Sequence, residues 1–218
     1  MDKRQERTHE ILMEMRDFLI ETREEWSLYN VHRDGRINSA HDEDAIVKQL
    51  RKKFGMDVFV TTEDVGISNR GWWDIWFVET DSPVNVKSSN HKSADNACNF
   101  LAMLWSLTDV EIEKRRNPNA GKDTTQYIES LQSNTPVTVN RDYWFFSVNK
   151  KDPSEITITS VRSLKQATLN SNNLPFQINW SKNHELKERT VTEAREYYND
   201  ILKRTLEKDW RKQLYEAL

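Results

Sequence analysis

Three polar residues interrupt two apolar runs near the middle of the chain: Asp74 lies within residues 72–78, and Asn85 and Lys87 lie within residues 84–88. Side chains of a strand alternate between faces, so Asn85 and Lys87, two positions apart, share one face. Burying a carboxylate among aromatic residues and an ammonium between valines costs several kcal/mol unless each finds a partner. A divalent metal held by Asp74, with Lys87 beside an attacking water, would provide that partner and the groups that phosphodiester hydrolysis requires. The structural alternative is an Asp74–Lys87 ion pair, or Asp74 facing solvent.

The spacing of these residues resembles the PD-(D/E)xK nuclease signature, in which an acid on one strand precedes an acid-x-Lys on the next. Four segments are similar, in the same order, to segments of HincII-like type II restriction endonucleases: residues 44–47, 74–78, 85–94 and 178–180. This resemblance implies an α/β fold with a central mixed β-sheet flanked by helices. It also implies a Mg²⁺ cofactor and a homodimer that cleaves a palindromic site in double-stranded DNA to blunt ends.

One residue departs from the family pattern. Asn85 stands where the family has Asp or Glu, so one metal-binding carboxylate is neutral here. The amide oxygen of Asn85 can still bind Mg²⁺, or another acid can reach the site. Glu63 and Asp44 are the favoured candidates, although either could be a solvated surface acid, and strand alternation points Glu79 away from Asp74. The predicted catalytic set is therefore Asp74, Lys87, Asn85 and Glu63, with Asp74, Asn85 and Glu63 binding the metal.

A polar segment follows Lys87 directly and predicts DNA contacts. Asn can bond bidentately to adenine, and Lys and Ser bond phosphates or bases. The resemblance assigns base-edge and groove contacts to this segment, with Asn96 as the best match to a base-reading residue, and Asn179 is the second candidate reader. The alternatives are an ordinary polar loop with helix caps, and an Asn179 that satisfies buried backbone. The predicted DNA-binding residues are Ser89, Asn90, His91, Lys92, Ser93, Asp95, Asn96, Asn99, Gln177, Asn179 and Lys182.

Hydrophobic periodicity predicts the elements that must position these residues. Helices are expected over residues 9–29, 40–54, 94–107 and 191–215, with another starting at Thr108, and strands over 58–60, 72–78, 84–88, 143–148, 156–159 and 176–180. The chain predicts one nuclease domain over 1–218: N-terminal helices (9–54), a catalytic hairpin and recognition loop (56–107), and C-terminal strands and helix (140–218). Apolar residues of the first helix could form either the dimer contact or part of the core.

Composition excludes several classes of protein. The net charge of -3 argues mildly against non-specific coating of nucleic acid. The single cysteine excludes an internal disulfide and favours the cytoplasm. The sequence predicts neither a membrane span nor a nucleotide cofactor, because long apolar runs and glycine-rich phosphate loops are absent. The histidines are scattered without metal-ligand spacing, which argues against a zinc enzyme.

Three rival interpretations remain. One is a monomeric repair or nicking nuclease of the same superfamily. Another is a DNA-binding protein without cleavage activity, which the neutral Asn85 would suit. The last is an α/β protein in which Asp74 and Lys87 are only structural.

Overall fold

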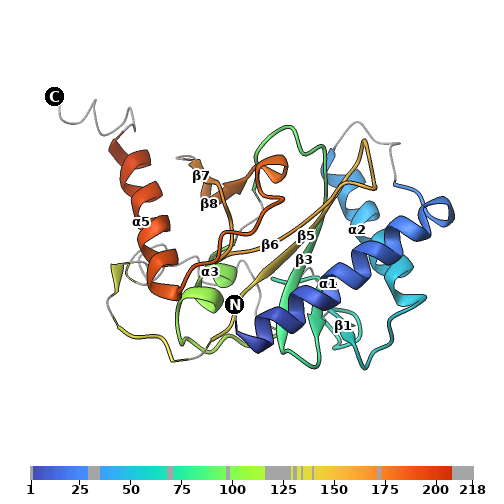
Figure 1. Cartoon of the computed structure of the whole chain (residues 1–218), viewed down its shortest axis with the longest axis horizontal. Helices are drawn as coiled ribbons and strands as arrows, with labels where there is room; N and C mark the ends of the chain where they lie inside the picture. Colours follow the sequence, from blue (N-terminus) through green and yellow to red (C-terminus); the bar gives the residue numbers. More distant parts are fainter. Residues whose placement is uncertain are drawn as a thin grey trace.

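The chain folds around a five-stranded mixed sheet (Figure 1). The computed structural model describes residues 2–28, 35–67, 71–96, 99–115, 129, 132–133, 135–138, 140–170 and 173–207. The strand order is β1 (Phe59–Thr61), β2 (Ile75–Phe77), β3 (Ser82–Ser89), β5 (Trp144–Asn149) and β6 (Ile156–Ser160). β3 and β5 are parallel, and the other neighbours are antiparallel. The predicted α/β class with a mixed central sheet is therefore confirmed.

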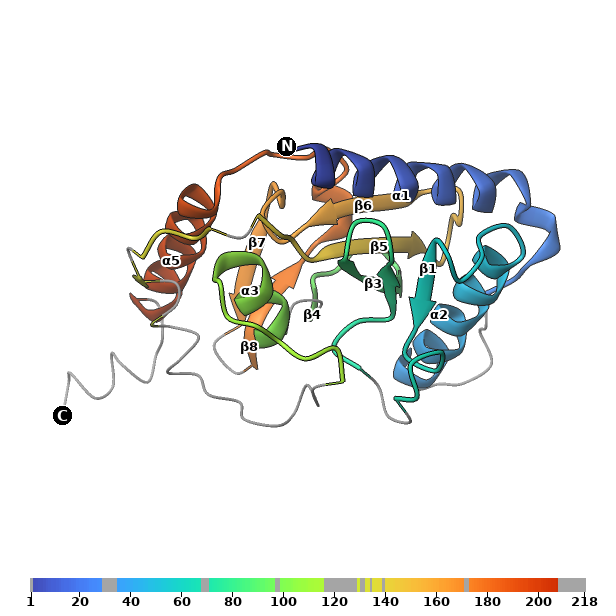
Figure 2. The same ribbon diagram turned by 90° about the horizontal axis from the view of Figure 1, so that it is seen from below.

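Two N-terminal helices cover one face of this sheet. Figure 2 shows α1 (Lys3–Glu21) lying along that face, and α2 (Gly35–Arg51) packs beside β3. The helices and the sheet share a core that includes Leu12, Met15, Trp26, Ile46, Leu50, Val84, Val86, Trp144 and Phe146. Because Met15 and Trp26 are buried in this core, they are not available as a dimer contact.

The opposite face is covered by α3 (Phe100–Leu107), α5 (Val191–Glu207) and a second, three-stranded sheet. The second sheet has the order β4 (Asp95–Asn96), β8 (Asn173–Ile178) and β7 (Ala167–Asn170). The core on this side is rich in aromatic side chains and includes Trp72, Trp73, Trp76, Trp105, Tyr143, Phe145, Phe176, Trp180 and Tyr198. Two short 3-10 helices, η1 (Arg23–Glu25) and η2 (Trp180–Lys182), complete the fold.

Several predicted boundaries are wrong. α1 ends at Glu21, and α2 begins four residues before Ser39, so Ser39 lies inside the helix rather than capping it. Residues 95–96 form a strand, so α3 starts only at Phe100, and Thr108 ends that helix instead of starting another. The strand β7 was missed altogether. Within the described residues, no helix is both long and apolar enough to cross a bilayer.

Candidate active site

Asp74 lies immediately before β2, where it contacts the backbone of β3. The Asp74 N–H donates to the carbonyl oxygen of Val84 (2.9 Å), and the N–H of Val86 donates to Asp74 Oδ2 (2.7 Å). The carboxylate therefore lies beside the stretch of β3 that carries Asn85 and Lys87. Val84 and Val86 pack in the core under α1, so alternation directs Asn85 and Lys87 to the other side of the strand.

Asp74 lines a cavity of about 340 Å³ between α2 and the turn that follows β1. Both acids favoured from the sequence, Glu63 and Asp44, line the same cavity. Glu79 does not: it pairs with Arg7 of α1 at 3.2 Å, as strand alternation predicts. The charged side chains that line the cavity are Glu43, Asp44, Lys48, Glu63 and Asp74.

Glu43 is a site residue that the sequence analysis missed. Its Oε1 lies 3.2 Å from Lys87 Nζ, and only 13% of its side chain and 26% of the lysine side chain are exposed. Lys87 thus forms an ion pair with Glu43 at the margin of the cavity. A signal was present, because Glu43 lies one helical turn before Ile46 and Val47, on the inward stripe of the helix.

Asn85 also has an unusual environment for a polar residue. Its side chain is 9% exposed and, among the described residues, its Oδ1 accepts no hydrogen bond. Buried carbonyl oxygens without a partner are uncommon in folded proteins and call for an explanation such as an ion or a water. The oxygen thus lacks a partner among the described residues, although Asn85 does not line the cavity, and its role as a metal ligand stays a prediction.

A buried ion pair holds α2 against the end of the central sheet. Asp42 is fully buried, accepts a hydrogen bond from Ser88 Oγ (2.8 Å) and lies 2.9 Å from Lys150 Nζ. Lys150 in turn donates to Ser39 Oγ at 3.2 Å. These contacts fix the turn of α2 that presents Glu43 to Lys87.

Removing the Asp42 carboxylate should destabilise the protein markedly. We expect Asp42→Ala to lower the free energy of unfolding by about 3 kcal/mol, because it leaves Lys150 without its buried counterion. Asp44→Ala, two residues along the same helix and exposed, should change it by less than about 0.5 kcal/mol. Equal unfolding midpoints in urea for the two variants would show that the buried pair does not stabilise this junction.

The predicted DNA-contact residues divide into exposed and buried groups. Asn90, Lys92, Ser93 and Lys182 are exposed, whereas Ser89 is 7% exposed and His91 is 2% exposed. The prediction that Ser89 and His91 contact DNA is not compatible with this burial. Asp95 accepts a hydrogen bond from Trp180 Nε1 (2.7 Å), and Asn99 caps α3 by accepting from the Ala102 N–H (2.8 Å). Both therefore make structural contacts within the protein.

The two segments predicted to read DNA meet in the second sheet. Asn96 and Gln177 are cross-strand partners of β4 and β8, and Gln177 Nε2 donates to Asn96 Oδ1 at 2.9 Å. Asn179 lies just beyond β8, where its Oδ1 accepts from Ser181 Oγ at 2.8 Å. The residues from the two segments thus form one polar surface, although they lie about eighty positions apart in the sequence.

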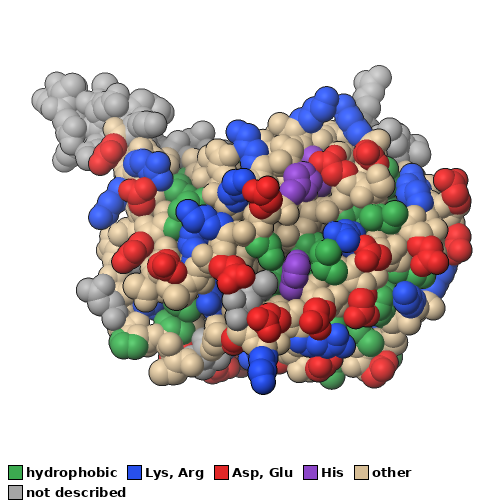
Figure 3. Space-filling model, viewed as in Figure 1, with side chains coloured by type: hydrophobic (Ala, Val, Ile, Leu, Met, Phe, Trp, Pro, Cys, Tyr) green, Lys and Arg blue, Asp and Glu red, His purple; other side chains and the backbone are tan. Residues whose placement is uncertain are grey.

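The charged surface is mixed on the face seen in Figure 3. Acidic and basic side chains alternate there without a continuous basic field. This agrees with the net charge of -3.

The fold and this cavity define an α/β protein with a cluster of carboxylates between α2, the turn after β1 and the start of β2. Comparisons with protein-family models, with curated proteins and with solved structures found no match to the chain. Its function must therefore be argued from its own residues.

Proposed function

We propose that this protein is a Mg²⁺-dependent endonuclease that hydrolyses phosphodiester bonds in double-stranded DNA. The observation that carries the proposal is that Asp74 and Glu43 line one cavity and that Glu43 holds Lys87 in an ion pair at 3.2 Å. Clustered carboxylates concentrate negative charge, which a divalent cation offsets, and a nearby ammonium can stabilise charge that develops on a phosphate.

The residues around the cavity suit magnesium. Mg²⁺ prefers oxygen ligands and is commonly held by one or two carboxylates while it keeps several waters. Asp74 and Glu43 would provide the carboxylates, and the unpartnered Oδ1 of Asn85 would provide a neutral oxygen. Glu63, from the turn after β1, is a further ligand on the opposite wall. When bound, Mg²⁺ would polarise the phosphate and lower the pKa of a water.

Glu43 would supply the carboxylate that is missing at Asn85. The family pattern has an acid at that position of the strand, and here the acid would come from the neighbouring helix instead. Glu43 contacts Lys87 directly, whereas no contact to that lysine is recorded for Glu63 or Asp44. We therefore place Glu43 ahead of both as the second carboxylate.

Lys87 would act on the attacking water and on the phosphate. Its ammonium is already held near the carboxylates by Glu43, so little side-chain entropy is lost when a substrate binds. The substrate phosphate would compete for the same ammonium. The protein would thus hold the Lys87 ammonium and several oxygen ligands in one place before DNA binds.

The specific form of the proposal is a type II restriction endonuclease. A homodimer would place two such sites on a palindromic duplex, because two-fold symmetry in the protein matches two-fold symmetry in the DNA. The polar surface around Asn96 and Gln177 would read bases in a groove. A central cut that leaves blunt ends follows from the resemblance alone.

A plasmid digest tests the activity. Incubation of supercoiled plasmid with the protein and Mg²⁺ should give discrete linear fragments, and a chelator should prevent them. Intact plasmid under all conditions would instead indicate a binder without cleavage. Relaxed circles without linear product, together with a monomer on a short duplex by size measurement, would favour a nicking or repair enzyme.

Substitutions in the second sheet test recognition. Asn96→Ala and Asn179→Ala should each weaken discrimination at one base pair by about 1 to 3 kcal/mol, because a bidentate amide contact is lost. Lys182→Ala removes an exposed ammonium that we expect to contact phosphate, so it should weaken binding to all sequences similarly. Binding to a set of duplexes that differ by single base pairs measures both effects. If the asparagine variants lose the same affinity for every duplex in the set, these asparagines contact the DNA backbone and not the bases.

A further inference from the structure

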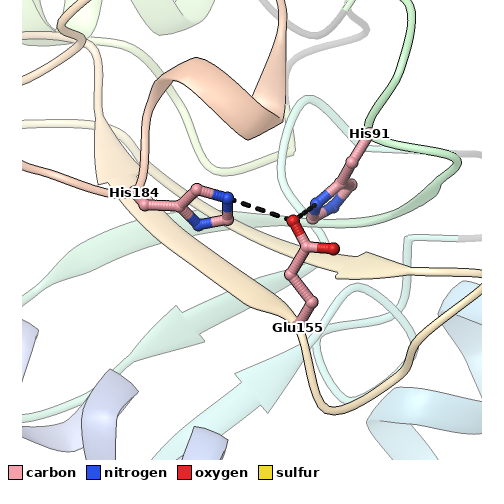
Figure 4. Close-up of side chains that lie close together, drawn as sticks. All are labelled: His91, Glu155 and His184. Atoms are coloured by element: carbon pink, nitrogen blue, oxygen red, sulfur yellow. Dashed lines mark hydrogen bonds and ion pairs between the residues drawn. The ribbon is translucent and has the colours of Figure 1, made fainter.

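His91, Glu155 and His184 come together at one end of the central sheet, outside the cavity described above (Figure 4). Glu155 Oε1 lies 3.4 Å from His91 Nδ1 and 3.1 Å from His184 Nε2. One ligand atom from each residue falls within 4.8 Å of the others. The sequence analysis argued against a zinc site because the histidines are scattered, and the tertiary structure removes that objection.

The separations suit a single first-row metal ion. Zinc lies about 2.0 to 2.2 Å from imidazole nitrogen and carboxylate oxygen, so tetrahedral ligands lie roughly 3.3 to 3.5 Å apart. The two distances to Glu155 Oε1 are close to this range.

Each histidine is also oriented through its other ring nitrogen. His91 Nε2 lies 3.0 Å from Ser147 Oγ, and His184 Nδ1 lies 3.0 Å from Thr157 Oγ1. Ser147 of β5 and Thr157 of β6 are cross-strand partners. The hydroxyl groups of this one residue pair therefore orient both imidazole rings. If each imidazole donates to its hydroxyl, the lone pairs of His91 Nδ1 and His184 Nε2 both face Glu155. Hydrogen bonds of this kind orient histidine ligands in known metal sites.

The charge states of the cluster agree with metal binding. Burial lowers the pKa of His91, which favours the neutral imidazole that metals require. A hydrogen bond from Asn149 to Glu155 Oε2 lowers the pKa of the glutamate and keeps it ionised. The buried ring of Trp180 lies beside His91, with its centroid 6.5 Å from that of the imidazole.

We propose that His91, Glu155 and His184 bind one divalent transition-metal ion of the zinc class. His91 is buried, whereas 35% of the Glu155 side chain and 41% of the His184 side chain are exposed, so solvent can occupy a remaining coordination position. Nitrogen ligands distinguish this site from the all-oxygen magnesium site proposed above. The inference does not depend on nuclease activity.

The bound ion would join three segments that are distant in sequence. His91 follows β3 on the loop that leads to Asn96, Glu155 precedes β6, and His184 follows η2 just beyond Asn179. The metal would therefore link the segment that carries Asn96 and the segment that carries Asn179 to the central sheet. Such a link would stabilise this polar surface.

Metal titration of the whole chain, free of any affinity tag and stripped with a chelator, tests the site. Calorimetric titration with Zn²⁺ should show one ion per chain, and Co²⁺ should give visible absorption typical of a protein-bound ion. His184→Ala should weaken Zn²⁺ binding at least about 100-fold, and Glu155→Gln should weaken it as well. The matched control is His41→Ala, which removes an exposed histidine outside the cluster and should leave the affinity unchanged.

Thermal unfolding distinguishes lost binding from lost folding. Because His184 is partly exposed, the wild type and His184→Ala should unfold at similar temperatures in chelator, and saturating Zn²⁺ should raise only the wild-type midpoint. The proposal fails if the wild type binds no more Zn²⁺ than His184→Ala. It also fails if Glu155→Gln, folded normally, keeps full affinity, since the three residues would then form only a hydrogen-bonded network.

Discussion

Lys87→Ala should reduce the rate of Mg²⁺-dependent DNA cleavage by about 10²- to 10³-fold while binding to the duplex is retained. The ammonium of Lys87 is held 3.2 Å from Glu43 at the margin of the cavity that Asp74 lines, where it can stabilise charge on a phosphate. The magnitude is that expected when one preorganised electrostatic group is removed from a water-poor site. Single-turnover cleavage of a labelled duplex, with binding measured in Ca²⁺, checks both parts.

The control separates catalysis from structure. Lys52→Ala removes an exposed lysine that pairs with Glu25, away from the cavity, and its cleavage rate should match the wild type. Loss of the Glu43 partner could also destabilise α2, so the unfolding midpoint of Lys87→Ala is measured alongside. A folded Lys87→Ala variant that cuts at the wild-type rate would end the proposed role of this lysine.

Asp74→Asn is the second large expected effect, and it is chosen because it preserves the local structure. The amide oxygen can still accept the hydrogen bond from the Val86 N–H, which Asp74 Oδ2 accepts at 2.7 Å. The negative charge that would bind Mg²⁺ is lost, so cleavage should fall at least about 10³-fold, with a change in unfolding free energy below about 0.5 kcal/mol. Asp74→Ala should also abolish cutting and should cost about 1 kcal/mol more, since the hydrogen bond is removed.

The comparison of the two variants decides between a structural and a metal-binding carboxylate. If Asp74 only anchors β3, the Asn variant cleaves normally and the Ala variant is merely less stable. Asp57→Asn, at an exposed position near the start of β1, serves as the charge control and should cleave like the wild type. Binding of Mn²⁺, followed by its paramagnetic effect on water relaxation, would show directly whether Asp74→Asn has lost the ion.

The strands of the candidate site were predictable because they depend on local pattern. Alternation around Val84 and Val86 indicated which way Asn85 and Lys87 point, and the same alternation excluded Glu79. The hairpin around Asp74 was expected within a few residues. Helix ends were less well predicted, since Ser39 resembles a cap in sequence but lies inside α2.

The partners of these residues could not be predicted. Glu43 and Lys87 are 44 positions apart, and the contact exists because Asp42 is buried against Ser88 and Lys150 at the end of the sheet. Likewise, the polar loop after β3 was expected to face DNA throughout, but packing turns His91 inward at a positive φ of 55°.

By itself, the sequence determined the α/β class, the hairpin that carries Asp74 and Lys87, and the polar segment that follows it, because these depend on residue types at short, regular spacing. Only the tertiary structure decided which acid meets Lys87, which loop residues are buried, and that His91, Glu155 and His184 converge. Such contacts depend on how helices and strands pack across long sequence separations. Local periodicity carries no information on that packing.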